Sequence, residues 1–298
     1  PVSPSACLSI GACIIGSIAP LILKLHPRAS CLCGEGDCVQ ILIVVPAYNE
    51  ETTIDRCLEA ISNQQLGTSQ HQCSVVVVAN GCTDKTAEKA SGWVDRFSEA
   101  GMHLRVLQTA SAGKCHALNM AENTASPDAT IYIDADVVID PLILSQLAEA
   151  LAPPTPRFAT GTLLTAPMTS RTSQIYADIW LQLASLSDAT KGCGLYAVNR
   201  AGRARWGAFP DIHSDDKFVR LQFEPAERVT VAATYMWPVP EGLVNLVRVR
   251  RRWCEGNREL LAKFPHSAKV EARSSARRHL ISRLMFRDPI GLGVFSGI

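Results

Sequence analysis

The chain has few charged and few aromatic side chains, and no large excess of either charge. Charged residues make up 19% of its 298 residues and aromatic residues 6%, whereas about a quarter of the residues in an average soluble domain are charged. With 47% apolar residues, this composition excludes a disordered, fibrous or coiled-coil chain. The formal net charge of +1 and the lack of a recognisable nucleic-acid-binding module predict no nucleic-acid partner.

The chain also lacks a regular disulfide framework. Its 11 cysteines are scattered along the sequence, and an odd number in a chain of this length favours a reducing compartment. Cys31, Cys33 and Cys38 lie close together. Zinc sites usually show paired ligand spacing and a fourth ligand, which are missing here, so we do not predict a metal at this cluster.

Basic residues are concentrated near the end of the chain. Between Arg248 and Arg287 there are 12 Lys or Arg residues and 3 Asp or Glu residues, whereas the rest of the chain has 17 and 25. Such a region can bind phosphate groups or lie on an anionic membrane surface. A solvated helical face is the simpler alternative.

One long apolar run stands near the start of the chain. Residues 6–25 read ACLSIGACIIGSIAPLILKL, with Lys24 as the one charged residue, and 20 such residues can cross a bilayer. A buried or interfacial helix is the alternative. A cleaved signal peptide is disfavoured, because it would place a thiol-rich chain in an oxidising compartment.

From Gln40 onward, apolar runs alternate with helical segments. Short runs rich in Val, Ile and Leu are typical of buried strands, and they occur at 41–45, 75–78, 104–107, 131–133 and 158–164. Helical patterns occur up to Ile61, near 86–97, at 141–151 and around 173–189. This alternation predicts an α/β fold with a mostly parallel sheet flanked by helices.

Polar residues follow three of these strands. In open α/β sheets, ligands bind outside the carboxyl ends of the strands, so these residues predict one shared crevice. They are Asn49 and Glu50, Asn80 and Asp84, and Asp134 and Asp136.

Two acidic pairs carry the chemistry that the residues themselves suggest. Asp134 and Asp136 flank one residue after a strand, and two carboxylates on one side suit Mg²⁺ or Mn²⁺ with phosphates completing the shell. Asp215 and Asp216 form a second pair, which could accept a proton from an attacking hydroxyl. Ordinary turn or helix-start aspartates are the alternative in both places.

A lysine at the expected start of a helix is a further candidate binding residue. Lys114 follows Gly113 where a helix is expected to begin. A cation beside free backbone N–H groups suits a phosphate, although an ordinary surface lysine is the alternative.

Together these motifs resemble those of family 2 glycosyltransferases with the GT-A fold. The resemblance runs from about residue 40 to about residue 263 and rests on several motifs in order and at the expected spacing. They read VVPAYNEE, VVANGCTDKTAE, GKCHALNMA, IYIDADVVID, SDD and RRRW.

The resemblance implies a role for individual residues. Asp216 matches the catalytic base, and Asp136 together with Asp134 matches the ligands of Mg²⁺ or Mn²⁺. The implied donor-binding residues are Pro46, Ala47, Tyr48, Glu50, Asn80, Asp84, Lys114, Asn119 and Asp134. The residues implied to lie near the acceptor and the diphosphate are Asp215, Arg252 and Trp253, although a core anchor is the alternative role for Trp253.

Three positions depart from the family pattern. Asn80 stands where an Asp usually reads the base, although an amide still has a donor and an acceptor. Asp215 stands where Glu is common. Val249 replaces the Gln of the QxxRW motif, which weakens the interpretation as a processive synthase.

The implied function is inverting transfer of a sugar from a nucleoside diphosphate sugar to a hydroxyl, by single displacement. UDP is the default nucleotide, and the acceptor could be lipid-linked or a glycan. We expect a membrane-associated protein with its catalytic domain on the cytoplasmic side. One alternative is a non-catalytic domain that binds a nucleotide sugar or a membrane partner. A sugar-nucleotide nucleotidyltransferase is another, but it would carry a Gly-rich loop where this chain has PAYNEE.

The predicted organisation has four parts. An anchor-like segment and linker span 1–39, and a nucleotide-sugar-binding half spans 40–151. An acceptor-binding and catalytic half spans 152–264. A basic helical region, which could lie close to a membrane, spans 265–298.

Overall fold

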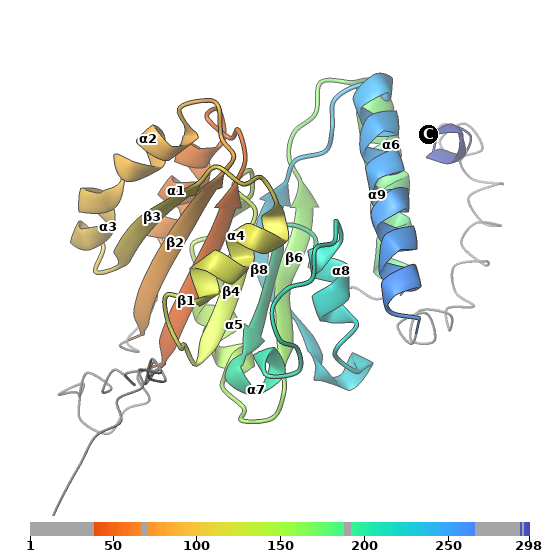
Figure 1. The fold of residues 1–298 in the computed structure, drawn as a ribbon. Helices are drawn as coiled ribbons and strands as arrows, with labels where there is room; N and C mark the ends of the chain where they lie inside the picture. Colours follow the sequence, from red (N-terminus) through yellow and green to blue (C-terminus); the bar gives the residue numbers. More distant parts are fainter. Residues whose placement is uncertain (1–38, 67–70, 188–191, 266–292, 294) are drawn as a thin grey trace, which may run out of the picture. The chain divides into compact units, whose positions relative to one another are not determined.

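The structure, a computed structural model, describes residues 39–66, 71–187, 192–265, 293 and 295–298. They form one sheet with the strand order β3-β2-β1-β4-β7-β6-β8-β5 (Figure 1). The strands are β1 (Gln40–Ala47), β2 (Gln72–Asn80), β3 (His103–Thr109), β4 (Ala129–Ile133), β5 (Val138–Ile139), β6 (Phe158–Thr165), β7 (Leu195–Asn199) and β8 (Arg228–Trp237). The helices are α1 (Ile54–Ser62), α2 (Thr86–Ser91), α3 (Val94–Glu99), α4 (Lys114–Glu122), α5 (Ile143–Leu151), α6 (Arg171–Ser187), α7 (Arg200–Arg203), α8 (Asp215–Arg220), the 3₁₀ helix η1 (Pro225–Glu227) and α9 (Leu243–Lys263).

The sheet is parallel in its first half and mixed in its second. β1 pairs in parallel with β2 and β4, and β2 with β3, so the carboxyl ends of these four strands meet at one edge. β7 runs antiparallel between β4 and β6, while β6 and β8 are parallel and β5 joins β8 in antiparallel. The predicted α/β fold, with a mostly parallel sheet flanked by helices, is confirmed.

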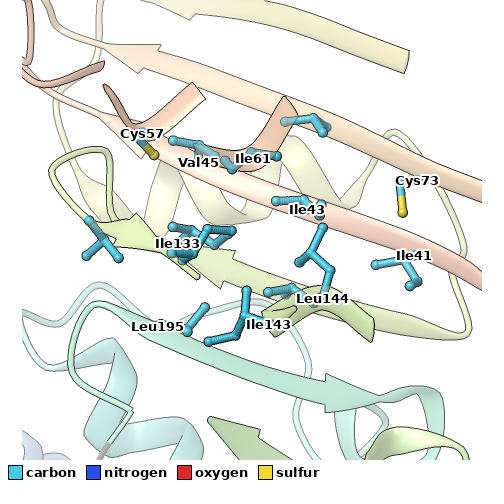
Figure 2. Packing of buried hydrophobic residues seen from close by; sticks show 14 of the residues in the cluster. Ile41, Ile43, Val45, Cys57, Ile61, Cys73, Ile133, Ile143, Leu144 and Leu195 are labelled. Carbon is cyan, nitrogen blue, oxygen red and sulfur yellow. The ribbon is translucent and has the colours of Figure 1, made fainter. Parts of the chain in front are cut away.

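Helices cover both faces of the sheet because β1 is apolar on both sides. Its seven residues from Ile41 to Ala47 are buried, and alternate side chains point to opposite faces. Ile41 and Ile43 pack in the cluster that contains α1 and α5 (Figure 2), whereas Leu42 and Val44 pack in the cluster that contains α4 and α8. Burial of each such side chain contributes about 1.5–3 kcal/mol, so the two layers fix the orientation of β1.

One predicted helix is wrong in its extent. The segment 86–97 does not form a continuous helix but two short ones, α2 and α3. The break falls at Gly92 and Trp93, and glycine weakens a helix at that point. Gly92 N–H donates to the carbonyls of Glu88 and Lys89, which ends α2.

Several predictions lie outside the described residues. They are the apolar segment 6–25, the cysteine cluster at 31–38 and most of the basic region 265–298. In the part of the chain that the structure describes, no helix is both long and apolar enough to span a bilayer. The described cysteines Cys57, Cys73, Cys82, Cys115, Cys193 and Cys254 are free thiols.

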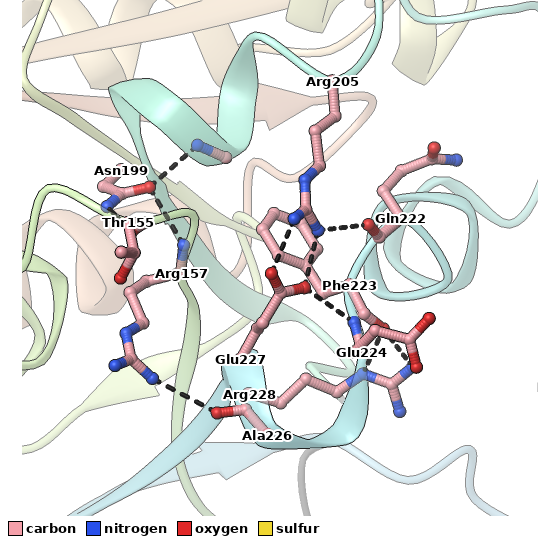
Figure 3. A network of polar contacts seen from close by, with 11 residues as sticks. Thr155, Arg157, Asn199, Arg205, Gln222, Phe223, Glu224, Ala226, Glu227 and Arg228 are labelled. Carbon is pink, nitrogen blue, oxygen red and sulfur yellow. Dashed lines mark hydrogen bonds and ion pairs between the residues drawn. The ribbon is translucent and has the colours of Figure 1, made fainter.

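The chain passes from the first half of the sheet to the second through a segment held by one buried asparagine. Asn199 Nδ2 donates to the carbonyls of Pro153 (2.8 Å) and Thr155 (2.7 Å). Its Oδ1 accepts the N–H groups of Arg157 (3.0 Å) and Gly202 (2.8 Å) (Figure 3). The predicted division at 151/152 falls at the start of this segment and stays a prediction. Strands from both sides of it belong to one sheet.

Neighbouring contacts extend the network around Asn199 to the start of β8. Arg205 forms an ion pair with Glu227 of η1 (2.6 Å), and Arg157 donates to the carbonyl of Ala226 (Figure 3). The two ends of the segment between α7 and β8 are therefore tied to each other and to β6.

We predict that Asn199→Ala lowers the free energy of unfolding by about 2–4 kcal/mol, because buried backbone groups lose their partner. Urea denaturation would measure the change. Asn63→Ala, at an exposed asparagine after α1, is the control and should change stability by less than about 0.5 kcal/mol. Equal effects of the two substitutions would contradict the assigned role of Asn199.

Candidate active site

The polar residues predicted to share a crevice follow neighbouring strands. β2, β1 and β4 are adjacent in the sheet, so Asn80, Glu50 and Asp134 lie along one edge at the carboxyl ends of these strands. Short loops follow each strand there. The topology therefore brings the three strand-end motifs to one place, as the sequence predicted.

The loops after β1 and β2 bind each other. Asn49, in a left-handed conformation with φ of 56°, accepts the N–H of Thr83 on its Oδ1 (2.8 Å). Glu50 N–H donates to Thr86 Oγ1 (2.8 Å), and Glu51 N–H donates to Asp84 Oδ2 (3.1 Å). The carboxylate of Asp84 thus accepts backbone N–H groups within this pair of loops. Three further residues were predicted to bind the donor. Pro46 and Ala47 are buried at the end of β1, and Tyr48, which follows β1, is 54% exposed.

Asn80 is a buried cross-link at the end of β2. Its Nδ2 donates to the carbonyls of Ala47 (2.9 Å) and Val78 (3.3 Å), and its Oδ1 accepts the N–H of Gly113 (3.1 Å). Both amide hydrogens are used, so Asn80 can offer a ligand only its Oδ1. A recess of about 270 Å³ lies at the ends of β2 and β3 and is lined by Ala79, Cys82, Gln108, Thr109 and Ala110.

Asp134 and Asp136 lie in the turn that follows β4. Val137 N–H donates to the carbonyl of Asp134, which closes the turn. Burial raises the pKa of Asp136 to about 7, and the carboxylates of Asp134 and Glu50 add to the effect. Burial also raises the pKa of Glu50, against the opposing hydrogen bond from Thr53. These carboxylates repel one another. A bound cation would therefore stabilise their charged forms.

Lys114 joins the two acidic segments. It is the first residue of α4, and its Nζ lies 2.8 Å from Asp134 Oδ1 and 3.0 Å from Asp215 Oδ1. Although burial opposes the charged form, Asp134 and Asp215 raise the pKa of Lys114. Two aspartates far apart in the chain therefore share one ammonium group.

The two aspartates at the start of α8 have different surroundings. Asp215 has a side chain only 3% exposed, and its Oδ2 accepts the hydroxyl of Tyr196 (2.9 Å). Asp216 is partly exposed, and its Oδ1 accepts the N–H of Lys217 (2.7 Å). Burial, followed by the charge of Asp215, raises the pKa of Asp216 to about 6.

Asn119 holds the loop that leads to α8. Its Nδ2 donates to the carbonyl of Phe209 (3.0 Å), and its Oδ1 accepts the N–H of Phe209 (2.7 Å). This residue of α4, predicted to bind the donor, therefore contacts protein backbone. It also anchors the segment before Asp215 to the helix that carries Lys114.

Trp253 belongs to an aromatic cluster next to the acidic turn. Its ring lies 5.7 Å from that of Trp237, which in turn stacks on Trp180 of α6 at 5.4 Å. Gly194 lets Trp237 approach, since a Cβ there would lie 2.7 Å from Trp237 Cδ1. The carbonyl of Gly194 also accepts the N–H of Asp134. Arg252 is exposed on α9, and no ion pair in the described part of the chain joins it to the acidic residues.

The donor set suits a hard divalent cation only in part. Within the described residues, no group of three or more His, Cys, Asp or Glu side chains is arranged to hold a metal. Asp134 and Asp136 supply carboxylate oxygens, which Mg²⁺ and Mn²⁺ prefer, and Mg²⁺ is usually held by one or two carboxylates plus substrate phosphates and water. The residues therefore fit a cation that arrives with a phosphorylated ligand.

The sequence did not predict a role for Tyr196, whose hydroxyl donates to Asp215. It lies in the buried strand β7, where nothing in the run LYAVN distinguishes it from a core residue. Its hydroxyl finds Asp215 only because β7 pairs with β4 and α8 packs over both. The pairing of two strands far apart in the chain was the missing information.

Known proteins resemble this chain in sequence and in fold. A dolichyl-phosphate beta-glucosyltransferase of Drosophila melanogaster is 30% identical over 103 residues, which are 33% of this chain and 31% of that protein. The glycosyltransferase AglD of Haloferax volcanii is 29% identical over 126 residues, which are 42% of this chain and 19% of that protein. The matches thus cover less than a third of the length of either relative.

Two solved structures share the fold at low identity. The mannosyltransferase PcManGT of Pyrobaculum calidifontis, in complex with GDP-Man and Mn²⁺, has a TM-score of 0.58 and 22% identity, over 88% of this chain and 74% of that one. A glucosyl-3-phosphoglycerate synthase of Mycobacterium tuberculosis, in complex with Mn²⁺, UDP and glucosyl-3-phosphoglycerate, has a TM-score of 0.54 and 20% identity, over 75% and 79%.

The family itself is shown by sequence. Residues 42–202, more than half of the chain, match the model of glycosyl transferase family 2. This range contains the loops after β1 and β2, Lys114, the acidic turn and Tyr196, and it ends before Asp215. The chain belongs to glycosyl transferase family 2.

Proposed function

We propose that this protein transfers a sugar from a nucleoside diphosphate sugar to a hydroxyl acceptor with inversion, by a single displacement. The observation that carries the proposal is the pair of contacts from Lys114 to Asp134 and Asp215. These contacts bring two acidic segments to one site. One is the turn with Asp134, which could bind a cation, and the other is the start of α8, which could accept a proton. A single displacement needs a base for the attacking hydroxyl and no covalent nucleophile, and a cation would stabilise the charge on the leaving diphosphate.

The nucleotide would lie at the ends of β2 and β3. The recess of about 270 Å³ at these strand ends supports a base-binding role there. Asn80 is only 3% exposed and would hold the strand ends in place beneath the base. The N-terminus of α4 and Lys114 would face the diphosphate, because helix N-terminal N–H groups and an ammonium both favour phosphate oxygens. The solved neighbours hold GDP-Man or UDP, so UDP stays the default and GDP belongs in every test.

Asp216 would act as the base. Its pKa of about 6 keeps it deprotonated at neutral pH while leaving it basic enough to take the proton of an attacking hydroxyl. Asp215 is held by Tyr196 and Lys114, so it is less free to accept a proton. A bound Mg²⁺ or Mn²⁺ would supply Lewis-acid stabilisation of the leaving diphosphate, and Asp136 and Asp134 are the residues that would hold it.

The acceptor side would include α9 and a membrane surface. Leu243 and Val244, the latter 72% exposed, stand at the start of α9. Arg248, Arg251 and Arg258 follow on the exposed part of the helix. Apolar and cationic side chains on one helix favour contact with anionic lipid headgroups. A membrane-linked acceptor and a catalytic domain on the cytoplasmic side are consistent with this face and with the free thiols.

We predict that Asp216→Asn lowers turnover by about 10²–10⁴-fold, the usual cost of losing a general base, and leaves nucleotide binding intact. The measurement is release of UDP or GDP from a panel of nucleotide sugars with Mn²⁺ and lipid or glycan acceptors. Asp211→Asn, at an exposed aspartate four residues before α8, should keep the parental rate. Parental turnover of Asp216→Asn would rule out this residue as the base.

We predict that Asp136→Ala removes the Mn²⁺-dependent part of nucleotide binding, because it deletes a carboxylate that would hold the cation. The thermal shift produced by UDP or GDP should be larger with Mn²⁺ than without it in the parent protein, and equal in the variant. Asp95→Ala on the exposed surface of α3 is the control. An unchanged Mn²⁺ effect in Asp136→Ala would contradict the assignment.

We predict that replacing Arg248, Arg251 and Arg258 together by Glu abolishes binding to vesicles that contain anionic phosphatidylglycerol, since each basic residue near such a surface contributes about 1 kcal/mol. Co-sedimentation at low salt would measure it. The control replaces Arg56, Arg96 and Arg105, which are exposed elsewhere, and changes the net charge equally. Equal loss in both triple variants would show a general charge effect instead of a docking face.

A further inference from the structure

Lys114 is bound by two carboxylates, one of which is buried and the other partly exposed. Asp215 is buried, and Tyr196 holds its second oxygen. The Tyr196 ring is itself buried and stacks on Tyr132 at 4.6 Å between ring centroids. Asp215 is therefore fixed by the core, and a buried carboxylate keeps its cationic partner close, because an unpaired buried charge is costly.

Asp134 is the more accessible of the two carboxylates. Its side chain is 32% exposed and lies in a turn at the edge of the sheet. One of its oxygens already binds Lys114 at 2.8 Å. A divalent cation that approaches the acidic turn meets an ammonium group already bound to Asp134 and is repelled by its charge.

We propose that Lys114 is an internal counter-ion, held by Asp215 and Tyr196, which occupies Asp134 in the ligand-free protein and weakens the binding of a free divalent cation. An anionic diphosphate competes with Asp134 for the ammonium, so the donor and the cation each strengthen the binding of the other. This inference rests on the proposed function, since it assigns the order in which that site fills. Lys114 is thus a positioning residue that couples the acidic turn to the donor.

The test measures the affinity for Mn²⁺ alone, without nucleotide, from the paramagnetic signal of free Mn²⁺. Lys114→Met should bind Mn²⁺ more tightly than the parent protein, on the order of tenfold, because a positive charge beside the cation is removed. Lys114→Arg keeps the charge and should retain the weak parental affinity. Lys263→Met is the control, because Lys263 also forms an ion pair, with Glu259 (2.9 Å), but lies at the end of α9 away from the acidic turn.

A second pair of variants guards against misfolding. Lys114→Met leaves Asp215 buried without its cation, whereas Lys114→Met combined with Asp215→Asn does not. The double variant is compared with Asp215→Asn alone, so that both proteins carry the same change at position 215 and differ only at Lys114. The double variant should again bind Mn²⁺ more tightly. Unchanged or weaker Mn²⁺ binding in both comparisons would overturn the counter-ion role.

Addition of UDP or GDP separates this inference from the proposed function. In the parent protein the nucleotide should increase the Mn²⁺ affinity, and this increase should be smaller in the variants that lack Lys114. If no nucleotide affects Mn²⁺ binding in the parent protein while Lys114→Met still tightens it, the counter-ion role stands and the proposed function fails. If the nucleotide effect has the same size with and without Lys114, the coupling through Lys114 is wrong.

Discussion

The ammonium group of Lys114 between Asp134 and Asp215 is the contact on which the site depends. Without a cation there, the acidic turn after β4 and the acidic start of α8 would repel each other, and Asp215 would be a buried, unpaired charge. Lys114 can take this place because α4 begins directly at the edge where β1, β2 and β4 end. One side chain therefore links the parallel part of the sheet to the later part of the chain.

Much of the surrounding polar structure holds backbone in place. Asn80 joins the ends of β1 and β2 to the loop before α4, and Asn119 joins α4 to the loop before α8. Asn199 does the same for the segment between α5 and β6. Each amide satisfies donors and acceptors that would be costly to bury unpaired. Asparagine thus positions the loops that carry the charged residues of the site.

The sequence predicted the parallel half of the fold well, because local patterns determine it. Each run of Val, Ile and Leu is long enough for one buried strand, and each acidic or amide motif follows such a run. β7 and its place between β4 and β6 were beyond local patterns, because antiparallel pairing of distant strands depends on the whole sheet. For the same reason the role of Tyr196 and the two carboxylate partners of Lys114 could not be predicted. Gly92 was a local signal for the break between α2 and α3. The helical periodicity of 86–97 nevertheless favoured one continuous helix in the prediction.

The proposed acceptor side depends on aromatic packing as well as on polar contacts. α6 and α9 lie side by side (Figure 1) and meet β8 through the rings of Trp180, Trp237 and Trp253. Gly256 brings α9 against the segment before α8, since a Cβ there would lie 2.7 Å from Ser214 Oγ. α9 is thus positioned by aromatic stacking, by this close approach and by polar contacts, which include Asn257 with Lys217 (2.9 Å) and Glu259 with His213 (2.9 Å). Because His213, Ser214 and Lys217 flank Asp215 and Asp216, these contacts tie the position of α9 to that of the proposed base, so sequence changes on the proposed acceptor side would also affect the start of α8.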